Sequence, residues 1–173
     1  TVMMTGTSGE VVLSESAPVR GTDLALTLDS ALQEYAELRL ADVPSASAIV
    51  MLQASTGSVL AAASGPGGAG MSTATVGQYA PGSTFKIATA LAALQAGRTE
   101  PKEKVDCDGR YELADRKFRC WNRSGHGRVD LHRALKESCD VYFFEMARRL
   151  GIETLSDTAR LLGLGVTYDL GLP

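Results

Sequence analysis

Apolar side chains recur at helical spacing in several stretches of this chain. Ile87, Leu91 and Leu94 follow one another at intervals of three or four residues, in an alanine-rich run that stops near Gly97. Such spacing places apolar side chains along one face of a helix. A proline and a glycine at positions 81–82 come just before it and are typical of the end of a loop. We therefore expect a loop that becomes a helix close to these two residues.

Two further helices are predicted downstream, on either side of a short turn. Residues 129–137 form a pattern typical of a short helix with Asp130 as its cap, and a second amphipathic helix is expected from about 141 to 150, closing at Gly151. The residues between them, 138–140, should then form a turn. Such a turn can project a side chain into a cleft while the two helices hold it still.

The first candidate site is a serine and a lysine at the start of the predicted helix. Ser83 and Lys86 lie three residues apart, so the hydroxyl and the amine share one helix face. Ser83 also falls in the first turn, where free backbone N–H groups and the helix dipole favour developing negative charge. A serine beside an amine that can take its proton is a nucleophile with its base. The alternative is a capping serine with a solvated lysine, and the Pro-Gly context favours the nucleophile.

The second candidate site is the Ser-Cys-Asp turn. Ser138 and Asp140 flank a cysteine at the point where the second of the two downstream helices begins. By itself, a serine-aspartate turn is more often a helix cap than a catalytic pair. The turn indicates a catalytic site only in combination with the Ser83 motif.

Together, the two motifs resemble the transpeptidase domain of class B penicillin-binding proteins. The segment YAPGSTFK at residues 79–86, followed by KESCDVYFF at residues 136–144, looks most like the elongation-specific, rod-shape members. Residues 47–63 resemble the first hairpin of that family, with two apolar runs joined by Ser-Thr-Gly at 55–57. Residues 21–30 resemble the stretch that leads into the domain. The implied fold is α+β, of the penicillin-binding protein and serine β-lactamase type, with a helical cluster and the first strands of an antiparallel sheet.

The resemblance implies a role for each residue of the two motifs. Ser83 would attack the D-Ala-D-Ala carbonyl of a peptidoglycan stem peptide to form an acyl-enzyme, and its backbone N–H would provide half of the oxyanion hole. Lys86 would be the base, which requires a neutral amine, and burial favours that form. Ser138 would relay the proton toward the leaving nitrogen. Asp140 stands where the family usually has Asn.

An aspartate at that position raises a question about the base. An ionised carboxylate only accepts hydrogen bonds, and close to Lys86 it would stabilise the ammonium and oppose the role of that residue as base. We expect either that a substrate amide relieves this pairing or that Asp140 is turned elsewhere.

We expect the chain to be half of a catalytic domain. The third motif of the family, Lys-Thr-Gly or Lys-Ser-Gly on an edge strand, is absent from these 173 residues. Residues 1–20 would be a lead-in from a missing N-terminal pedestal domain, and residues 21–173 would be the N-terminal half of the transpeptidase domain. Near its start, Ser30 and Gln33 are expected to form a capping box that opens a helix to Leu40. We expect the fragment to be inactive, or nearly so, by itself.

Composition limits the class of partner. The hydrophobic content of 45% is enough for a core, and a net charge of −3 without a basic stripe argues against nucleic acid. No apolar run approaches the eighteen or so residues of a membrane span. Five basic residues are expected to lie in a solvated loop. They are Arg116, Lys117, Arg119, Arg123 and Arg128.

The resemblance also implies a function, a location and partners. The expected function is that of a peptidoglycan D,D-transpeptidase, a β-lactam target that cross-links stem peptides during cell elongation and needs no cofactor for catalysis. Its full-length parent would have an inner-membrane anchor, absent here, and a periplasmic catalytic domain. It would work with a glycan-polymerising synthase and other proteins of the elongation complex. The alternative is a non-catalytic, zinc-stabilised module that binds cell wall or partner proteins.

Three cysteines and a histidine are confined to one window of the chain. Cys107, Cys120, His126 and Cys139 have the spacing C-x12-C-x5-H-x12-C, with a glycine on either side of the histidine. Three thiolates and an imidazole are a complete tetrahedral ligand set for structural zinc. The odd number of cysteines would also allow one disulfide, from Cys107 to Cys120, and one free thiol. We weigh zinc ahead of this disulfide and of inert thiols.

A metal at these residues would bear directly on the second motif. Cys139 lies between Ser138 and Asp140, so its side chain should point away from theirs and toward the other three ligands. The ion would then hold the Ser138 turn from behind. Trp121, next to Cys120, is expected to pack against the loop that carries the cysteines.

Overall fold

The structure, a computed structural model, describes residues 2–6, 9–14 and 17–167. The chain divides into two compact units, residues 1–78 and residues 79–173. Both contain helices and antiparallel strands, in agreement with the predicted α+β class.

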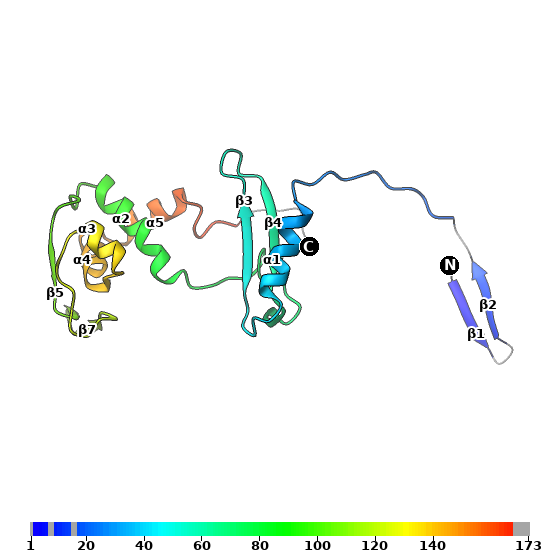
Figure 1. The fold of residues 1–173 in the computed structure, drawn as a ribbon, viewed down its shortest axis with the longest axis horizontal. Helices are drawn as coiled ribbons and strands as arrows, with labels where there is room; N and C mark the ends of the chain where they lie inside the picture. The colour runs from blue at the N-terminus through cyan, green and yellow to red at the C-terminus, as the bar shows by residue number, and fades with distance from the viewer. Residues whose placement is uncertain (1, 7–8, 15–16, 168–173) are drawn as a thin grey trace. The chain divides into compact units, whose positions relative to one another are not determined.

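The first unit contains a hairpin covered by a helix. Strands β3 (Ala48–Leu52) and β4 (Val59–Ser64) pair antiparallel, as expected for residues 47–63. Helix α1 (Ser30–Leu40) lies along β4 (Figure 1), and Ala36 of the helix packs with Ala63 of the strand in a small buried cluster. The unit also includes the paired strands β1 (Val2–Gly6) and β2 (Gly9–Ser14) and the 3-10 turn η1 (Pro66–Gly68).

Helix α1 is capped by Asp29, not by the predicted Ser30. The Asp29 carboxylate accepts a hydrogen bond of 3.0 Å from the backbone N–H of Leu32. Gln33 turns to the neighbouring strand, where its side-chain oxygen accepts a hydrogen bond of 2.8 Å from the backbone N–H of Ala62. The predicted capping box is therefore wrong, because an aspartate one residue earlier takes the cap and the glutamine fixes the helix to β4.

Helices form the centre of the second unit. The 3-10 turn η2 (Gly82–Thr84) leads directly into α2 (Phe85–Gln95). Farther along the chain come α3 (Leu131–Lys136), α4 (Asp140–Leu150) and α5 (Ile152–Leu161). Helix α2 packs against α4 and α5, which places the start of α2 beside the turn between α3 and α4.

The ends of these helices follow the sequence signals. Helix α2 ends just before Gly97, which has a φ of 60°. The Asp130 carboxylate caps α3 by accepting a hydrogen bond of 2.9 Å from the backbone N–H of Arg133. Helix α4 ends at Gly151, whose φ of 74° is readily adopted by glycine. A turn does separate α3 from α4, as predicted, but it spans residues 137–139, and Asp140 is the first residue of α4.

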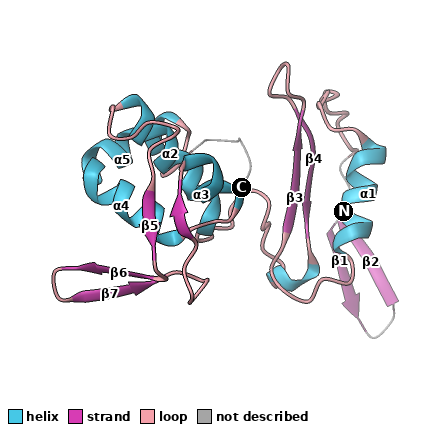
Figure 2. Cartoon of the chain, turned by 60° about the vertical axis from the view of Figure 1, so that its left-hand side comes forward, coloured by secondary structure: helices cyan, strands magenta, loops and turns pink. Residues whose placement is uncertain are grey.

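The segment between α2 and α3 contains four short strands that the sequence did not reveal. Strand β5 (Val105–Cys107) pairs with β8 (Gly127–Val129), and β6 (Arg110–Leu113) pairs with β7 (Arg116–Arg119), both antiparallel (Figure 2). The expected solvated loop is thus wrong for the basic residues in β7 and β8, although their side chains are exposed. Short, charged strands have no alternating apolar pattern by which they could be recognised.

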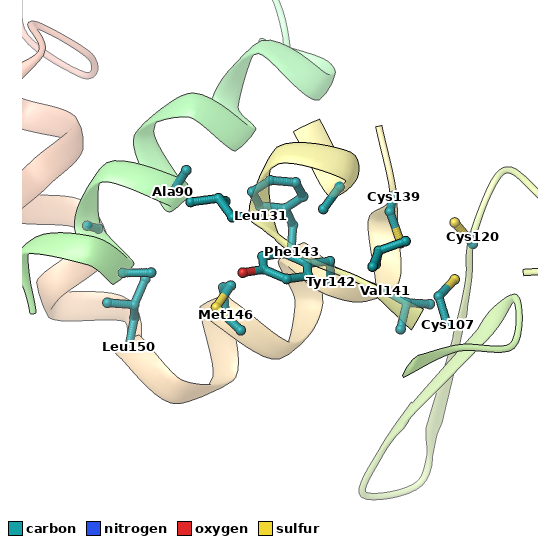
Figure 3. Packing of buried hydrophobic residues seen from close by; sticks show 14 residues of the cluster. Ala90, Cys107, Cys120, Leu131, Cys139, Val141, Tyr142, Phe143, Met146 and Leu150 are labelled. Atoms are coloured by element: carbon teal, nitrogen blue, oxygen red, sulfur yellow. The ribbon is translucent and has the colours of Figure 1, made fainter. Parts of the chain in front are cut away.

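The core of the second unit runs from the contact between α2 and α4 to the three cysteines. Tyr142 and Met146 of α4 are fully buried, and the Tyr142 hydroxyl forms a hydrogen bond of 3.1 Å with the Thr99 hydroxyl. In Figure 3, Leu150 lies at one end of this cluster and the cysteine side chains lie at the other. The turn that carries Ser138 is therefore anchored in the core through its middle residue, Cys139.

A network of charges fixes α4 to the strands and to the segment before them. Glu145 accepts hydrogen bonds from the Tyr111 hydroxyl at 2.8 Å, from Arg148 at 2.7 and 2.9 Å and from Arg149 at 2.8 Å. Arg149 also pairs with Glu103 at 2.6 Å. Hydrogen bonding from Arg148, joined by Arg149 and Tyr111, outweighs burial and lowers the pKa of Glu145 to about 2.

Replacing Glu145 with Gln should weaken the dependence of stability on acid pH. A depressed folded-state pKa contributes stability above the unfolded pKa, and this contribution is lost as pH falls toward the folded pKa. The free energy of unfolding should therefore fall between about pH 6 and about pH 3 by about 1–2 kcal/mol more in the wild type than in Glu145→Gln. Urea titration at both pH values measures the difference, with the exposed Glu153→Gln as control. Equal pH dependence of the wild type and Glu145→Gln would refute the expectation.

Candidate active site and cysteine cluster

The start of α2 and the turn between α3 and α4 bring four polar side chains together. Ser138 Oγ donates a hydrogen bond of 3.0 Å to Ser83 Oγ. The Lys86 amine donates to Ser138 Oγ at 3.0 Å and to Asp140 Oδ1 at 2.6 Å. The four residues expected to be catalytic are thus in one hydrogen-bonded group, although two come from each of two segments distant in sequence.

Ser138 lies between the serine and the lysine of the first motif. Ser83 and Lys86 each form a hydrogen bond with Ser138 Oγ. Among the hydrogen bonds of the described residues, none joins Ser83 directly to Lys86. A proton that moves between the Ser83 hydroxyl and the Lys86 amine in this arrangement would pass through the Ser138 hydroxyl.

The backbone of Ser138 is in the left-handed region, with a φ of 52°. This conformation costs a residue with a side chain on the order of 1 kcal/mol or more, so neighbouring contacts must hold it. The backbone N–H of Cys139 donates to the Ala134 carbonyl at 2.9 Å, and the Lys86 amine donates to the Ser138 carbonyl at 2.9 Å. The turn is therefore restrained both by α3 and by α2.

Asp140 is turned toward the lysine. Its Oδ1 pairs with Lys86, and its Oδ2 accepts a hydrogen bond of 2.9 Å from the backbone N–H of Trp121. Burial alone would raise the pKa of Asp140, but the hydrogen bonds from Lys86 and Trp121 outweigh it and hold this pKa below its usual range. The carboxylate thus lies in direct contact with the Lys86 amine, at 2.6 Å.

The group opens to solvent on one side. Ser83 is exposed, while the Lys86 side chain is only 13% exposed. A hollow of about 450 Å³ is lined by both residues, by Ser138 and by the apolar side chains of Ile87 and Leu135. A ligand in this hollow would reach the Ser83 hydroxyl before it reached the lysine.

The three cysteines and His126 form a buried cluster behind the turn. One possible ligand atom from each of Cys107, Cys120, His126 and Cys139 lies within 4.8 Å of all the others. His126 Nδ1 is 3.6 Å from Cys107 Sγ and 3.5 Å from Cys120 Sγ. The residues grouped in the sequence analysis therefore meet in space, and all three cysteines are free thiols.

The donor set and its spacing fit a tetrahedral zinc ion. A sulfur at 2.3 Å and a nitrogen at 2.0–2.1 Å from one tetrahedral zinc are about 3.6 Å apart, which matches the two observed S···N separations. Burial raises the pKa of the Cys139 thiol to about 12, so a metal would have to displace the proton of this thiol. His126 Nε2 is buried without a hydrogen-bond partner among the described residues, whereas zinc-bound histidines usually have one there.

Trp121 contributes more to the site than its sequence position indicated. We expected it to pack against the cysteine loop rather than to line the cleft, and its ring does contact His126 at a centroid distance of 5.4 Å. Its backbone N–H also binds Asp140, and its indole N–H donates to the Glu137 carbonyl at 3.0 Å. Its place next to Cys120 is the only sequence feature that could have suggested a role.

Comparison with known proteins agrees with these motifs. Residues 47–173 match the family model of the penicillin binding protein transpeptidase domain. The chain belongs to this transpeptidase family. The resemblance expected from the Ser83 and Ser138 motifs is therefore confirmed.

Individual relatives of this transpeptidase chain are known from sequence and from structure. The peptidoglycan D,D-transpeptidase MrdA of Acinetobacter baumannii is 32% identical over 93% of this chain, which spans 27% of that relative's length. PBP2 of Pseudomonas aeruginosa, solved with WCK 5153, is 38% identical with a TM-score of 0.73 over 86% of this chain and 39% of that one. PBP2 of Helicobacter pylori, solved with MreC, is 27% identical with a TM-score of 0.77 over 95% of this chain and 35% of that one.

No described helix is long and apolar enough to cross a membrane.

Replacing Gly125 with Ala should disrupt the segment that carries His126. A Cβ at Gly125 would lie 2.2 Å from the Cys107 carbonyl oxygen, and the residue has a φ of 80°. Gly127→Ala is a matched control, because Gly127 has a φ of 67° but open space around its Cβ position. We expect Gly125→Ala to lower the free energy of unfolding by about 1–3 kcal/mol more than Gly127→Ala, measured by urea titration. Equal losses in the two variants would mean that the close approach of residue 125 to the Cys107 backbone does not determine the stability.

Proposed function

We propose that this chain is the N-terminal half of the catalytic domain of a peptidoglycan D,D-transpeptidase that cross-links stem peptides during cell elongation. The observation that carries the proposal is the hydrogen-bonded group of Ser83, Ser138 and Lys86 beneath an open hollow. Residues 21–173 would form this half domain and residues 1–20 would lead in from a pedestal domain. The names of the relatives support the same reaction.

Ser83 would be the nucleophile. Its Oγ attacks the carbonyl carbon of the penultimate D-Ala, and its proton passes to a neutral Lys86 amine through the Ser138 hydroxyl. Collapse of the tetrahedral intermediate breaks the C–N bond to the terminal D-Ala, whose nitrogen takes a proton through Ser138. An acceptor amine then attacks the acyl-enzyme and forms the cross-link. A β-lactam would acylate the same hydroxyl.

Asp140 sets a condition on this reaction. Its carboxylate lies 2.6 Å from the Lys86 amine, and a lysine that is charged in such an ion pair cannot act as a base. Because the carboxylate faces Lys86, the second of the two expectations from the sequence, that Asp140 is turned away from the lysine, does not hold. We propose that a substrate amide N–H takes over the carboxylate and releases the lysine for proton transfer.

Labelling with a fluorescent penicillin tests the nucleophile in the full-length protein. Ser83→Ala should abolish covalent labelling, because the acyl bond forms at this oxygen. Ser30→Ala is a control, since Ser30 is exposed and does not cap α1. Labelling retained in Ser83→Ala would refute the assignment. Absence of labelling in the wild type would favour the alternative, a non-catalytic module that binds cell wall or partners.

We further propose that Cys107, Cys120, His126 and Cys139 hold a structural zinc ion. The support is their mutual distance, their burial and the tetrahedral spacing of the sulfur and nitrogen atoms. Zinc would supply folding energy and hold Cys139, and with it the Ser138 turn, without taking part in acyl transfer.

Native and denatured intact masses of the chain, purified without chelator or reductant, test the zinc site. We expect a native mass greater by one zinc ion, less the displaced thiol protons. Removal of the ion should lower the free energy of unfolding by several kcal/mol, because metal binding and folding are coupled. It should also slow penicillin acylation of the full-length protein, and added zinc should restore both. A mass two protons light without metal would mean a disulfide and would refute the proposal.

The proposed partners follow from the reaction and from the relatives. Stem peptides and β-lactams would bind at Ser83. The structure of the Helicobacter pylori relative with MreC supports assembly of the full-length protein with another protein. A similar chain in a peptidoglycan synthase complex, solved to show how polymerization and crosslinking are coordinated, supports a glycan-polymerising synthase as a partner, alongside other proteins of the elongation complex. We propose that the full-length protein is anchored in the inner membrane with its catalytic domain in the periplasm, where its substrate lies.

A further inference from the structure

Trp121 forms hydrogen bonds on both sides of Ser138. Its indole N–H donates to the carbonyl of Glu137, the residue before Ser138, at 3.0 Å. Its backbone N–H donates to Oδ2 of Asp140, two residues after Ser138, at 2.9 Å. One residue outside the turn therefore binds both of its ends.

The Glu137 carbonyl is part of the peptide group that joins Glu137 to Ser138. The φ of Ser138, which is 52°, sets the orientation of this peptide group relative to the Cα and side chain of Ser138. Ser138 would gain by leaving this left-handed conformation unless the preceding peptide is held in place. The N–H of that peptide group donates to the Leu135 carbonyl at 3.2 Å, and its carbonyl accepts from the indole N–H. Lys86 instead binds the Ser138 carbonyl and hydroxyl.

The exposure of Trp121 separates this role from ordinary packing. The residue is 64% exposed, whereas Tyr142 on α4 is fully buried. An aromatic residue with most of its surface in solvent gains only part of the stabilisation of a core residue. The polar contacts of Trp121 are short and directed at the turn, and its ring contact is with His126 of the cysteine cluster.

We propose that Trp121 is a positioning residue for acyl transfer. Its indole N–H holds the peptide between Glu137 and Ser138, and this keeps Ser138 Oγ between Ser83 Oγ and the Lys86 amine. The inference rests on the proposed function. Trp121 itself exchanges no proton and touches none of the reacting atoms.

Two replacements remove the indole N–H, and they differ in how much of the ring they leave in place. Trp121→Phe removes the donor and part of the ring, while 3-benzothienylalanine, incorporated at position 121, keeps the bicyclic shape and has sulfur in place of N–H. In the full-length protein, each should lower the maximal rate of penicillin acylation about three- to tenfold, the loss expected for one hydrogen bond. The penicillin concentration at half-maximal rate and the zinc content should stay as in the wild type.

Phe118→Leu is the matched control. Phe118 is an aromatic residue on β7, three positions before Trp121, and its ring packs on Phe144 of α4. It should acylate at the wild-type rate. Wild-type rates in the benzothienylalanine protein would overturn the proposal, as would a loss of rate that follows a loss of zinc. If the wild type itself fails to acylate, the proposed function fails first, so the two failures are distinguishable.

A second measurement needs no reaction. This chain contains a single tryptophan, so its indole N–H gives one NMR signal. We expect that proton to exchange with solvent at least tenfold more slowly than in free tryptophan, because it is bound to a carbonyl. Exchange at the rate of free tryptophan would overturn the proposed hydrogen bond.

Discussion

The Lys86 amine makes three hydrogen bonds to the turn between α3 and α4, and the arrangement of the site depends on them. They reach the Ser138 carbonyl, the Ser138 hydroxyl and the Asp140 carboxylate. Lys86 is on α2, so these contacts join two segments that are more than fifty residues apart in sequence. Without them, Ser138 would lose a restraint on its left-handed backbone and Ser83 would lose its neighbour.

The same turn is held from the opposite side by the cysteine cluster. Cys139 is buried in the core, while Ser138 lines the hollow and Asp140 binds Lys86, so one tripeptide belongs both to the core and to the site. Cys120 and Trp121 are a second such pair of neighbours. The Cys120 thiol is buried in the core, while the Trp121 ring is exposed and its indole N–H binds the turn. Cys139 is therefore a direct covalent link between the cysteine cluster and Ser138.

Local signals in the sequence were enough to predict helices α1 to α4, whereas α5 was not predicted. Asp130, Gly97 and Gly151 mark helix ends because caps and left-handed glycines act within one turn of the backbone. The same kind of signal failed at Ser30, where a competing aspartate stood one residue earlier. It also failed for strands β5 to β8, whose pairing depends on residues far apart in the chain and whose side chains are mostly exposed.

The sequence by itself determined the residue types of the site, the boundaries of its helices and the family, because these depend on short motifs and local backbone preferences. Tertiary structure decided which groups touch. It placed Ser138 between Ser83 and Lys86, turned Asp140 toward the lysine and brought Trp121 to the turn. Such contacts depend on the packing of α2 against α4 and on the pairing of short strands. Local patterns of residue types do not show which distant segments will pack together, so these contacts could not be predicted from the sequence.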